Sequence, residues 1–246
     1  MTPPAEQESI CTYLEWDSKF FQLPIARLNR TRLDHSTVTN ALQWCNTNRI
    51  ECLYFLCDSD DPQTTYLAEA NGFHLTDVRV VFEQSLAQNE VVAAPSGAIR
   101  FARESDLGLL RTLASAAHHD TRFYFDKNFD RAKCDLLYET WIENSCRGFA
   151  QAVLVAEVDH QPAAYLTCHL KQNESQVGLV GVGESHQGQG LGTKLVQNFL
   201  AWSHGQGARR ATVATQGRNL AAQRLYQRNG FVTASVQLWY HRWFHR

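Results

Sequence analysis

The chain lacks three features that mark common functional classes. Its 23 basic and 25 acidic residues leave a net charge near −2, and the lack of a basic stripe argues against non-specific nucleic-acid binding. No Cys-x-x-Cys pair occurs among its seven cysteines, so we expect buried, reduced thiols rather than a disulfide frame or a zinc site. Residues 1–7 form no basic or apolar leader, and no later apolar run could span a bilayer. These absences predict a cytoplasmic protein without a membrane span.

An internal sequence repeat, here called the internal echo, divides the 246 residues into two halves. Residues 67–82 and 225–244 each read as a helix, an Asn-Gly-Phe stop and a long strand, at an offset of 158 positions. The first copy has Ala68 where the second has Tyr226, and no glycine-rich turn precedes it. Residues 93–97, Ala-Ala-Pro-Ser-Gly, have the composition of a linker. We therefore expect a truncated domain (1–92), a linker (93–97) and a complete domain (98–246); a merely common helix stop is the alternative.

A glycine-rich turn, Gln-Gly-Gln-Gly-Leu-Gly at residues 187–192, is the most informative stretch. It lies between an apolar strand pattern, Val177–Val182, and a helical pattern, Leu195–Trp202. Free backbone N–H groups at a helix N-terminus, with glycines that let a ligand approach the main chain, form a site for a pyrophosphate. Such turns also simply connect strands to helices, so this turn alone does not establish a site.

A second motif follows at residues 219–231, Asn-Leu-Ala-Ala-Gln-Arg-Leu-Tyr-Gln-Arg-Asn-Gly-Phe, and predicts a helix with a glycine C-cap. In this order and spacing the two motifs resemble the acyl-CoA signature of the GNAT superfamily of N-acetyltransferases. Turns and periodicity divide residues 99–246 into β-α-α-β-β-β-α-β-α-β, the topology that the resemblance implies. We therefore expect an α/β (α+β) fold, a mixed central sheet flanked by helices, preceded by an incomplete GNAT-like half.

The resemblance implies acetyl-CoA as co-substrate, direct transfer of its acyl group to an amine, and no metal. It assigns cofactor binding to Val180, Gly181, Val182, Gln187, Gly188, Gln189, Gly190, Leu191, Gly192, Thr193, Asn219 and Ala222. Residues 179–182 should diverge from the neighbouring strand, pair with the pantetheine, and polarise the thioester carbonyl through an N–H near Val182. Gln187 stands where relatives often carry Arg. Asn219 has two interpretations, a bond to the pantetheine or a cap of its own helix.

Proton transfer is only partly assigned. Tyr226 is the expected general acid, because its phenol near a helix end is placed to protonate the departing thiolate; a core aromatic is the alternative. The base stays open between Glu184, His186 and water, since both side chains also fit a solvated loop. His118 and His119 are adjacent, so they point in different directions and lack a third metal ligand at suitable spacing. A helix-end pair that interacts with the dipole is the favoured interpretation.

The acceptor is expected to contact residues 119–126, His-Asp-Thr-Arg-Phe-Tyr-Phe-Asp, which join two predicted helices. Arg122 suits a phosphate, Asp120 or Asp126 suits an amine, and Tyr124 suits stacking on a ring. An aromatic loop that pins helices to the sheet is the alternative.

Three further segments resemble one particular group of enzymes within this superfamily. Residues 122–126 (Arg-Phe-Tyr-Phe-Asp), 138–145 (Tyr-Glu-Thr-Trp-Ile-Glu-Asn-Ser) and 16–21 (Trp-Asp-Ser-Lys-Phe-Phe) are similar to the TDP-fucosamine acetyltransferases. That similarity implies an amino-sugar nucleotide as substrate, with acetyl transferred to the 4-amino group of a TDP-linked 4-amino-4,6-dideoxyhexose for surface polysaccharide synthesis.

Other functions remain open at this point. They are a GNAT acetyltransferase of another small amine, a sensor that binds acetyl-CoA without transfer, and a structural dimer-former. The near-neutral charge disfavours polyamines as substrates, and the presence of Tyr226 disfavours the sensor. The aromatic segment Ser235–Phe244 suits a homodimer contact, although core packing between the halves is the favoured interpretation.

Overall fold

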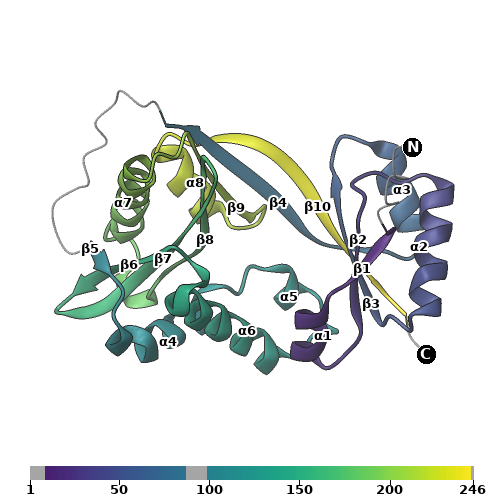
Figure 1. Ribbon diagram of the computed structural model, residues 1–246, viewed down its shortest axis with the longest axis horizontal. Coiled ribbons are helices and arrows are strands. Elements are labelled where there is room, and N and C mark those ends of the chain that lie inside the picture. The colour runs from purple at the N-terminus through teal and green to yellow at the C-terminus, as the bar shows by residue number, and fades with distance from the viewer. Residues whose placement is uncertain (1–8, 87–98, 245–246) are drawn as a thin grey trace, which may run out of the picture. The chain divides into compact units, whose positions relative to one another are not determined.

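The computed structural model describes residues 9–86 and 99–244 (Figure 1). The chain forms two compact units, which we describe separately: unit 1 comprises residues 1–79 and 236–246, and unit 2 comprises residues 80–235. The predicted linker at 93–97 lies outside the described residues, and the predicted domain limits stay a prediction. Within the described residues, no helix is long and apolar enough to cross a membrane.

Unit 1 is a small sheet with helices. Its elements are β1 (Cys11–Tyr13), α1 (Glu15–Phe21), β2 (Ile25–Leu28), α2 (His35–Thr47), β3 (Cys52–Asp58), α3 (Pro62–Ala70), the start of β4 (His74–Ser85) and most of β10 (Val232–Trp243). Strand β2 pairs antiparallel with β1 and parallel with β3, and β3 pairs antiparallel with β10 from Gln237 to Trp243. Tyr240 is buried in the core of this unit, with Leu238 and Phe244 packed against it. The aromatic strand is therefore a core strand of unit 1.

Unit 2 carries the larger, mixed sheet that the sequence predicts. Its elements are the end of β4, β5 (Ile99–Phe101), η1 (Glu104–Asp106), α4 (Leu107–Ala117), α5 (Arg122–Phe125), α6 (Arg131–Asn144), η2 (Ser145–Phe149), β6 (Ala152–Val158), β7 (Gln161–Lys171), β8 (Glu174–Val182), η3 (Glu184–His186), α7 (Leu191–Gly205), β9 (Arg210–Gln216) and α8 (Leu220–Arg228). The strand order is β4-β9-β8-β7-β6-β5, with β8 and β9 parallel and β5 to β8 antiparallel. The predicted loop at 119–126 contains the short helix α5.

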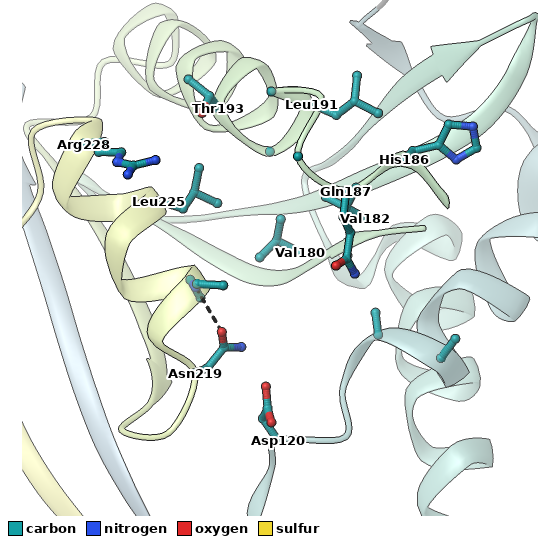
Figure 2. Close-up of a pocket in the computed structure, with 18 residues that line it drawn as sticks. Asp120, Val180, Val182, His186, Gln187, Leu191, Thr193, Asn219, Leu225 and Arg228 are labelled. Atoms are coloured by element: carbon teal, nitrogen blue, oxygen red, sulfur yellow. Dashed lines mark hydrogen bonds between the residues drawn. The ribbon is translucent and has the colours of Figure 1, made fainter. Parts of the chain in front are cut away.

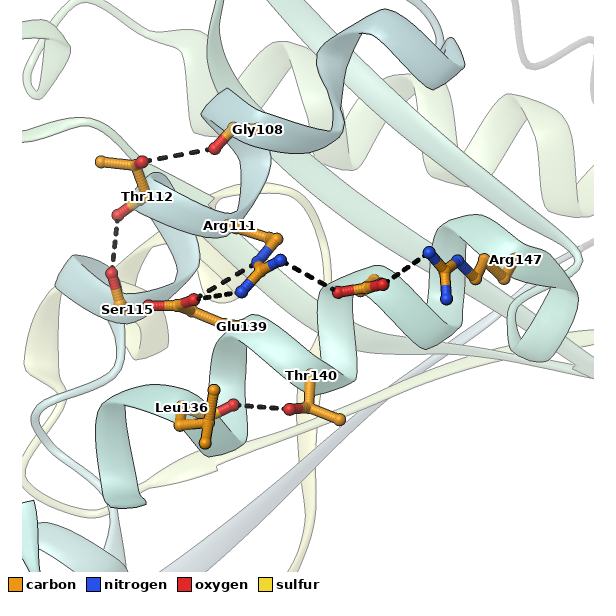
Figure 3. Close-up of polar contacts among 9 residues, drawn as sticks. Gly108, Arg111, Thr112, Ser115, Leu136, Glu139, Thr140 and Arg147 are labelled. Carbon is orange, nitrogen blue, oxygen red and sulfur yellow. Dashed lines mark hydrogen bonds and ion pairs between the residues drawn. The ribbon is translucent and has the colours of Figure 1, made fainter. Parts of the chain in front are cut away.

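Helices cover both faces of this sheet. Figure 1 shows α7 on one face and α4 with α6 on the other. Arg111 of α4 bonds Glu139 of α6 at 2.9 Å and lies 3.4 Å from Glu143, which in turn pairs with Arg147 at 2.7 Å (Figure 3). These partly exposed ion pairs hold α4 against α6, so the end of α4 has a fixed place over β7 and β8.

Strand β8 leaves its parallel neighbour halfway along, as expected. Its ladder with β9 ends at the pair Val177 and Val213. At this point β8 also bulges against β7, and the Leu179 N–H donates to the Thr167 hydroxyl at 2.8 Å instead of to a main-chain carbonyl. A Cβ on Gly178 would lie 2.4 Å from the His169 ring, so this glycine makes the bulge possible. Residues 178–182 therefore have no recorded ladder partner in β9.

The internal echo is a structural repeat. Elements β3, α3 and β4 have 7, 9 and 12 residues, and β9, α8 and β10 have the same lengths. The side chains of Asn71 and Asn229 both donate to the carbonyl four residues earlier, at 2.8 and 2.7 Å. Gly72 and Gly230 follow with φ of 75° and 87°, a conformation that favours glycine. The repeat thus reproduces the hydrogen bonding of the helix stop as well as its sequence.

The last strands of the two copies, β4 and β10, are exchanged, so that each pairs with the first strand of the other copy. Strand β3 pairs with β10 rather than with β4, and β9 pairs with β4 rather than with β10. Two hydrogen bonds, again 158 positions apart, close these pairings: Phe244 N–H to the Glu51 carbonyl at 3.0 Å in unit 1, and Leu86 N–H to the Arg209 carbonyl at 2.8 Å. Each unit therefore contains a strand from the other copy of the repeat.

Candidate active site

A pocket of about 530 Å³ opens in unit 2 where β8 diverges from β9 (Figure 2). It is lined by Ala116, Ala117, Asp120, Val180, Gly181, Val182, His186, Gln187, Gly188, Gly190, Leu191, Gly192, Thr193, Asn219, Ala221, Ala222, Leu225 and Arg228. Eleven of the twelve residues predicted to bind the cofactor are in this lining. The exception is Gln189, whose side chain donates to the Ser185 carbonyl at 3.2 Å.

The glycine turn leaves the N-terminus of α7 uncapped. Gly190 is the N-cap residue, with φ 78°, and has no side chain to accept from the first N–H groups of the helix. Gly188 has φ 76°, and a Cβ on either glycine would meet nothing within 4 Å. The 15-residue helix therefore presents free N–H groups and the positive end of its dipole to open space. This arrangement suits the oxygens of a diphosphate.

Helices α7 and α8 approach closely at the side of the pocket. A Cβ on Gly192 would lie 3.2 Å from Leu225 Cδ2, so the absent side chain lets the two helices pack together here. Arg228 lies further along α8 and lines the same pocket. Its guanidinium adds a positive charge near Thr193 of α7 (Figure 2). Arg228 was not predicted from the sequence. A signal existed, because Arg228 lies on the same predicted helix as Ala222, about two turns further along.

Asn219 caps α8. Its side-chain oxygen accepts from the Ala222 N–H at 3.0 Å, and the residue also lines the pocket. The capping interpretation is therefore confirmed, and a bond to the pantetheine stays a prediction.

Tyr226 is buried beneath the pocket rather than in its lining. It is 1% exposed, with ring centroids 6.0 Å from Phe82 and 5.9 Å from Phe231. Burial raises the pKa of Tyr226, which keeps the phenol protonated. The neighbouring Leu225 lines the pocket. Tyr226 is thus packed as a core aromatic, and its role as general acid stays a prediction.

The half-buried His118 and the buried Tyr165 form a pair that the sequence did not reveal. His118 Nε2 lies 2.7 Å from the Tyr165 hydroxyl, and its ring stacks on Tyr138 with centroids 4.6 Å apart. Burial, with a smaller effect of His119, lowers the pKa of His118 to about 4, so the imidazole is neutral. His118 is the C-cap residue of α4, as the helix-end interpretation expects, but its neutral ring bonds Tyr165 and adds no positive charge at the negative end of the dipole.

The same pair supports the strand that lines the pocket. Tyr165 is opposite Gly181 in the β7–β8 ladder, and a Cβ on Gly181 would lie 2.6 Å from the tyrosine ring. Gly181 therefore leaves room for Tyr165 on the face that α4 covers. A link between residues 47 positions apart has no local sequence signal.

The three predicted substrate residues lie outside this lining. The Tyr124 hydroxyl donates to Asp135, and the Asp126 carboxylate accepts from the Asn128 N–H at 3.0 Å. The Arg122 guanidinium lies 4.2 Å from the ring centre of Phe123. Their substrate roles stay predictions, and the local contacts of Tyr124 and Asp126 fit the alternative, a loop that stabilises itself.

Of the two candidate bases, His186 lines the pocket and Glu184 does not. His186 Nδ1 lies 3.0 Å from the Ser185 hydroxyl, and Glu184 lines a neighbouring cavity with Leu113 and Gly183. Among the described residues no group of three His, Cys, Asp or Glu side chains could hold a metal ion.

Comparisons with known proteins support this geometry. The family model described as "Acetyltransferase (GNAT) family" matches residues 113–231, which include the turn, α7 and α8. The chain is 32% identical over 174 residues to a dTDP-fucosamine acetyltransferase of Escherichia coli, covering 70% of this chain and 72% of that protein. It is 27% identical over 131 residues to the spore coat polysaccharide biosynthesis protein SpsD of Bacillus subtilis, covering 53% of this chain and 45% of that one.

A solved structure shows the same fold. The GCN5-related N-acetyltransferase from Sphaerobacter thermophilus aligns with a TM-score of 0.68 at 13% identity, over 95% of this chain and 76% of that one. Taken with the open N-terminus of α7 and the diverging strand β8, these matches establish that the chain belongs to the GNAT family of acetyltransferases and is an acyltransferase enzyme.

Proposed function

We propose that this enzyme transfers acetyl from acetyl-CoA to the 4-amino group of a TDP-linked 4-amino-4,6-dideoxyhexose. The observation that carries the substrate is the 32% identity, over 70% of the chain, to a dTDP-fucosamine acetyltransferase. The similarity to a spore coat polysaccharide protein supports a role in surface polysaccharide synthesis. Seven free cysteines, six of them buried, suit a reducing cytoplasm.

The pocket supports acetyl-CoA as the co-substrate. The uncapped N–H groups of α7 hold the diphosphate, and the unpaired edge of β8 at residues 178–182 pairs with the pantetheine. The Val182 N–H then donates to the thioester oxygen, on which negative charge builds as the amine attacks. No side chain is needed for these contacts, so they depend on backbone geometry, which Gly188 and Gly190 set at the turn and the bulge at Gly178 sets along β8.

Tyr226 protonates the thiolate in this proposal. The amine nitrogen forms a bond to the carbonyl carbon, the C–S bond breaks, and the electron pair on sulfur takes the phenol proton. The raised pKa of Tyr226 keeps that proton available. Because Tyr226 is 1% exposed, it reaches sulfur only if coenzyme binding opens a path beside Leu225.

The test is coenzyme A release with a panel of TDP-amino sugars, comparing the wild type with Tyr226→Phe. We expect turnover with a 4-amino sugar, and a fall in kcat on the order of 10²–10⁴-fold in the variant. Phe231→Leu, which changes the packing around the same ring but keeps the phenol, controls for loss of structure. Equal turnover by wild type and Tyr226→Phe would remove the proton-donor role.

A further inference from the structure

The pocket of unit 2 has two ends of opposite charge. Among the described residues that line it, Arg228 supplies a guanidinium and Asp120 supplies a carboxylate. Figure 2 shows Arg228 on the side of Thr193, and Asp120 at the other end, below Asn219 and Gln187. A pocket with this polarity favours a ligand that is anionic at one end and cationic at the other.

Two helix ends reinforce that polarity. The N-terminus of α7, positive by its dipole, lies at the turn of Gly188 and Gly190. The C-terminus of the 11-residue helix α4, negative by its dipole, brings Ala116 and Ala117 into the lining, four and three positions before Asp120. The Asp120 end of the pocket is therefore suited to a cation, and the other end to the diphosphate.

The main chain around Asp120 is held on both sides. Arg218 Nη1 donates to the Asp120 carbonyl at 3.1 Å, and its guanidinium lies 3.6 Å from the ring centre of Phe125. Two residues earlier, His118 bonds Tyr165 at 2.7 Å. In contrast to this anchored backbone, the Asp120 carboxylate has no hydrogen bond or ion pair within the part of the chain that the structure describes. The carboxylate is thus exposed and, among the described residues, unpaired on a backbone that is held in place.

The other nearby acids do not meet these conditions. Asp126 lies outside the lining and accepts from the main chain and side chain of Asn128 at 3.0 and 2.8 Å. Glu184 lies in a separate cavity. The choice between Asp120 and Asp126 that the sequence leaves open therefore falls on Asp120.

We propose that Asp120 binds the acceptor amine as an ammonium ion and takes up the proton that this amine loses before attack. The inference rests on the acetyl transfer proposed above. The carboxylate removes one N–H proton, and the freed lone pair attacks the thioester carbon. The C–N bond forms as the C–S bond breaks, and sulfur takes the proton of Tyr226. The second proton that nitrogen loses restores the Tyr226 phenol, and Asp120 returns its own proton to water. Asp120 is in this way a catalytic residue and selects cationic acceptors.

A binding experiment tests this without turnover and without the sugar nucleotide. Cyclohexylammonium and cyclohexanol, rings that differ in charge, are titrated into the complex of the protein with coenzyme A at pH 7. We expect the wild type to prefer the ammonium on the order of 10- to 100-fold, as for a charge-assisted hydrogen bond. Asp120→Asn, which keeps the shape, should lose this preference.

The control is Asp159→Asn in the β6–β7 turn, which removes the same charge from unit 2 outside the pocket. Asp159 has φ 50°, a conformation that Asn adopts readily, so this variant should keep the preference. Three results would overturn the proposal: a preference that persists in Asp120→Asn, one that disappears in Asp126→Asn instead, or a wild type that binds both rings equally or neither.

Kinetics then separate this inference from the proposed function. With an active acceptor, Asp120→Asn should raise KM for the amine at least tenfold and lower kcat, while acetyl-CoA binding stays unchanged. If no TDP-amino sugar is turned over but the ring probes behave as expected, the sugar assignment fails and the role of Asp120 stands. If a TDP-amino sugar is turned over equally by wild type and Asp120→Asn, the opposite holds.

Discussion

Helices α2 and α7 each follow a strand of a parallel pair, β2–β3 in unit 1 and β8–β9 in unit 2, yet they begin differently. Asp34 caps α2, where its carboxylate accepts from the Thr37 N–H at 2.6 Å. This bond from the Thr37 backbone, with a smaller effect of the bond from the Ser36 hydroxyl, lowers the pKa of Asp34 to about 2. Helix α7 starts at Gly190, which supplies no such group. The N-terminus of α2 thus has a negative charge supplied by the protein, whereas the N-terminus of α7 has none and is open to a negatively charged ligand.

The helices that follow differ in the same sense. Ala68 of α3 and Tyr226 of α8 occupy equivalent places in the repeat, and both are buried. The strand residues that correspond across the repeat are Tyr240 in the core of unit 1 and Phe82, which packs on Tyr226 in unit 2. Unit 2 thus has a phenol on the helix, and unit 1 has a phenol on the strand that β10 contributes to it. The comparison teaches that unit 1 keeps the scaffold of the repeat while its own side chain, Asp34, caps the helix N-terminus.

The largest effect is expected from giving α7 the cap of α2. Gly190→Asp should weaken acetyl-CoA binding on the order of 100-fold or more, because a carboxylate beside a diphosphate costs several kcal/mol. Calorimetric titration of coenzyme A measures this. Gly190→Asn tolerates the same φ of 78° without the charge and should lose much less. Equal losses in both variants would show that backbone strain, not charge, sets the affinity.

A smaller effect is expected from giving α3 the tyrosine of α8. Ala68 is 0% exposed, so Ala68→Tyr should lower the free energy of unfolding by about 1–3 kcal/mol through overpacking. Urea denaturation measures the change, with Ala70→Tyr on the exposed side of the same helix as control. A stable Ala68→Tyr would mean that the core of unit 1 still has room for the second phenol.

The smallest effect is expected from removing the cap of α2. Asp34→Ala should lower the melting temperature by a few degrees, since one N–H of the first turn loses its acceptor. The folded pKa of Asp34 lies below its unfolded value of 3.8, so its contribution is present above pH 4 and is lost as the pH falls through about 2. Melting curves of wild type and variant should therefore converge in acid. A constant difference down to pH 2 would contradict the cap.

Local signals in the sequence predicted most of the site and much of the fold. The left-handed conformations of Gly188 and Gly190 and the cap by Asn219 depend on a few neighbouring residues, so a short motif carries them. The β8–β9 ladder ends after Val177, and this divergence was expected because it is part of the fold of the family that the motifs resemble.

Contacts between distant segments were beyond such signals. The bond from His118 to Tyr165 forms only once α4 lies over β7, and a histidine at a predicted helix end reads as exposed before that. The Asp126 carboxylate, whose residue type suits an amine, bonds the nearby Asn128, and its substrate role stays a prediction. The exchange of β4 and β10 was also missed, because the period of a strand does not name its partner.

That exchange has a consequence for dissecting the molecule. A fragment cut at the predicted linker would carry β9 without β4, which leaves a row of unpaired amides and carbonyls along β9, and β10 without its partner β3. Each fragment lacks a strand that the other one carries. Co-expression of the two fragments should therefore restore a folded enzyme, whereas either fragment alone should aggregate.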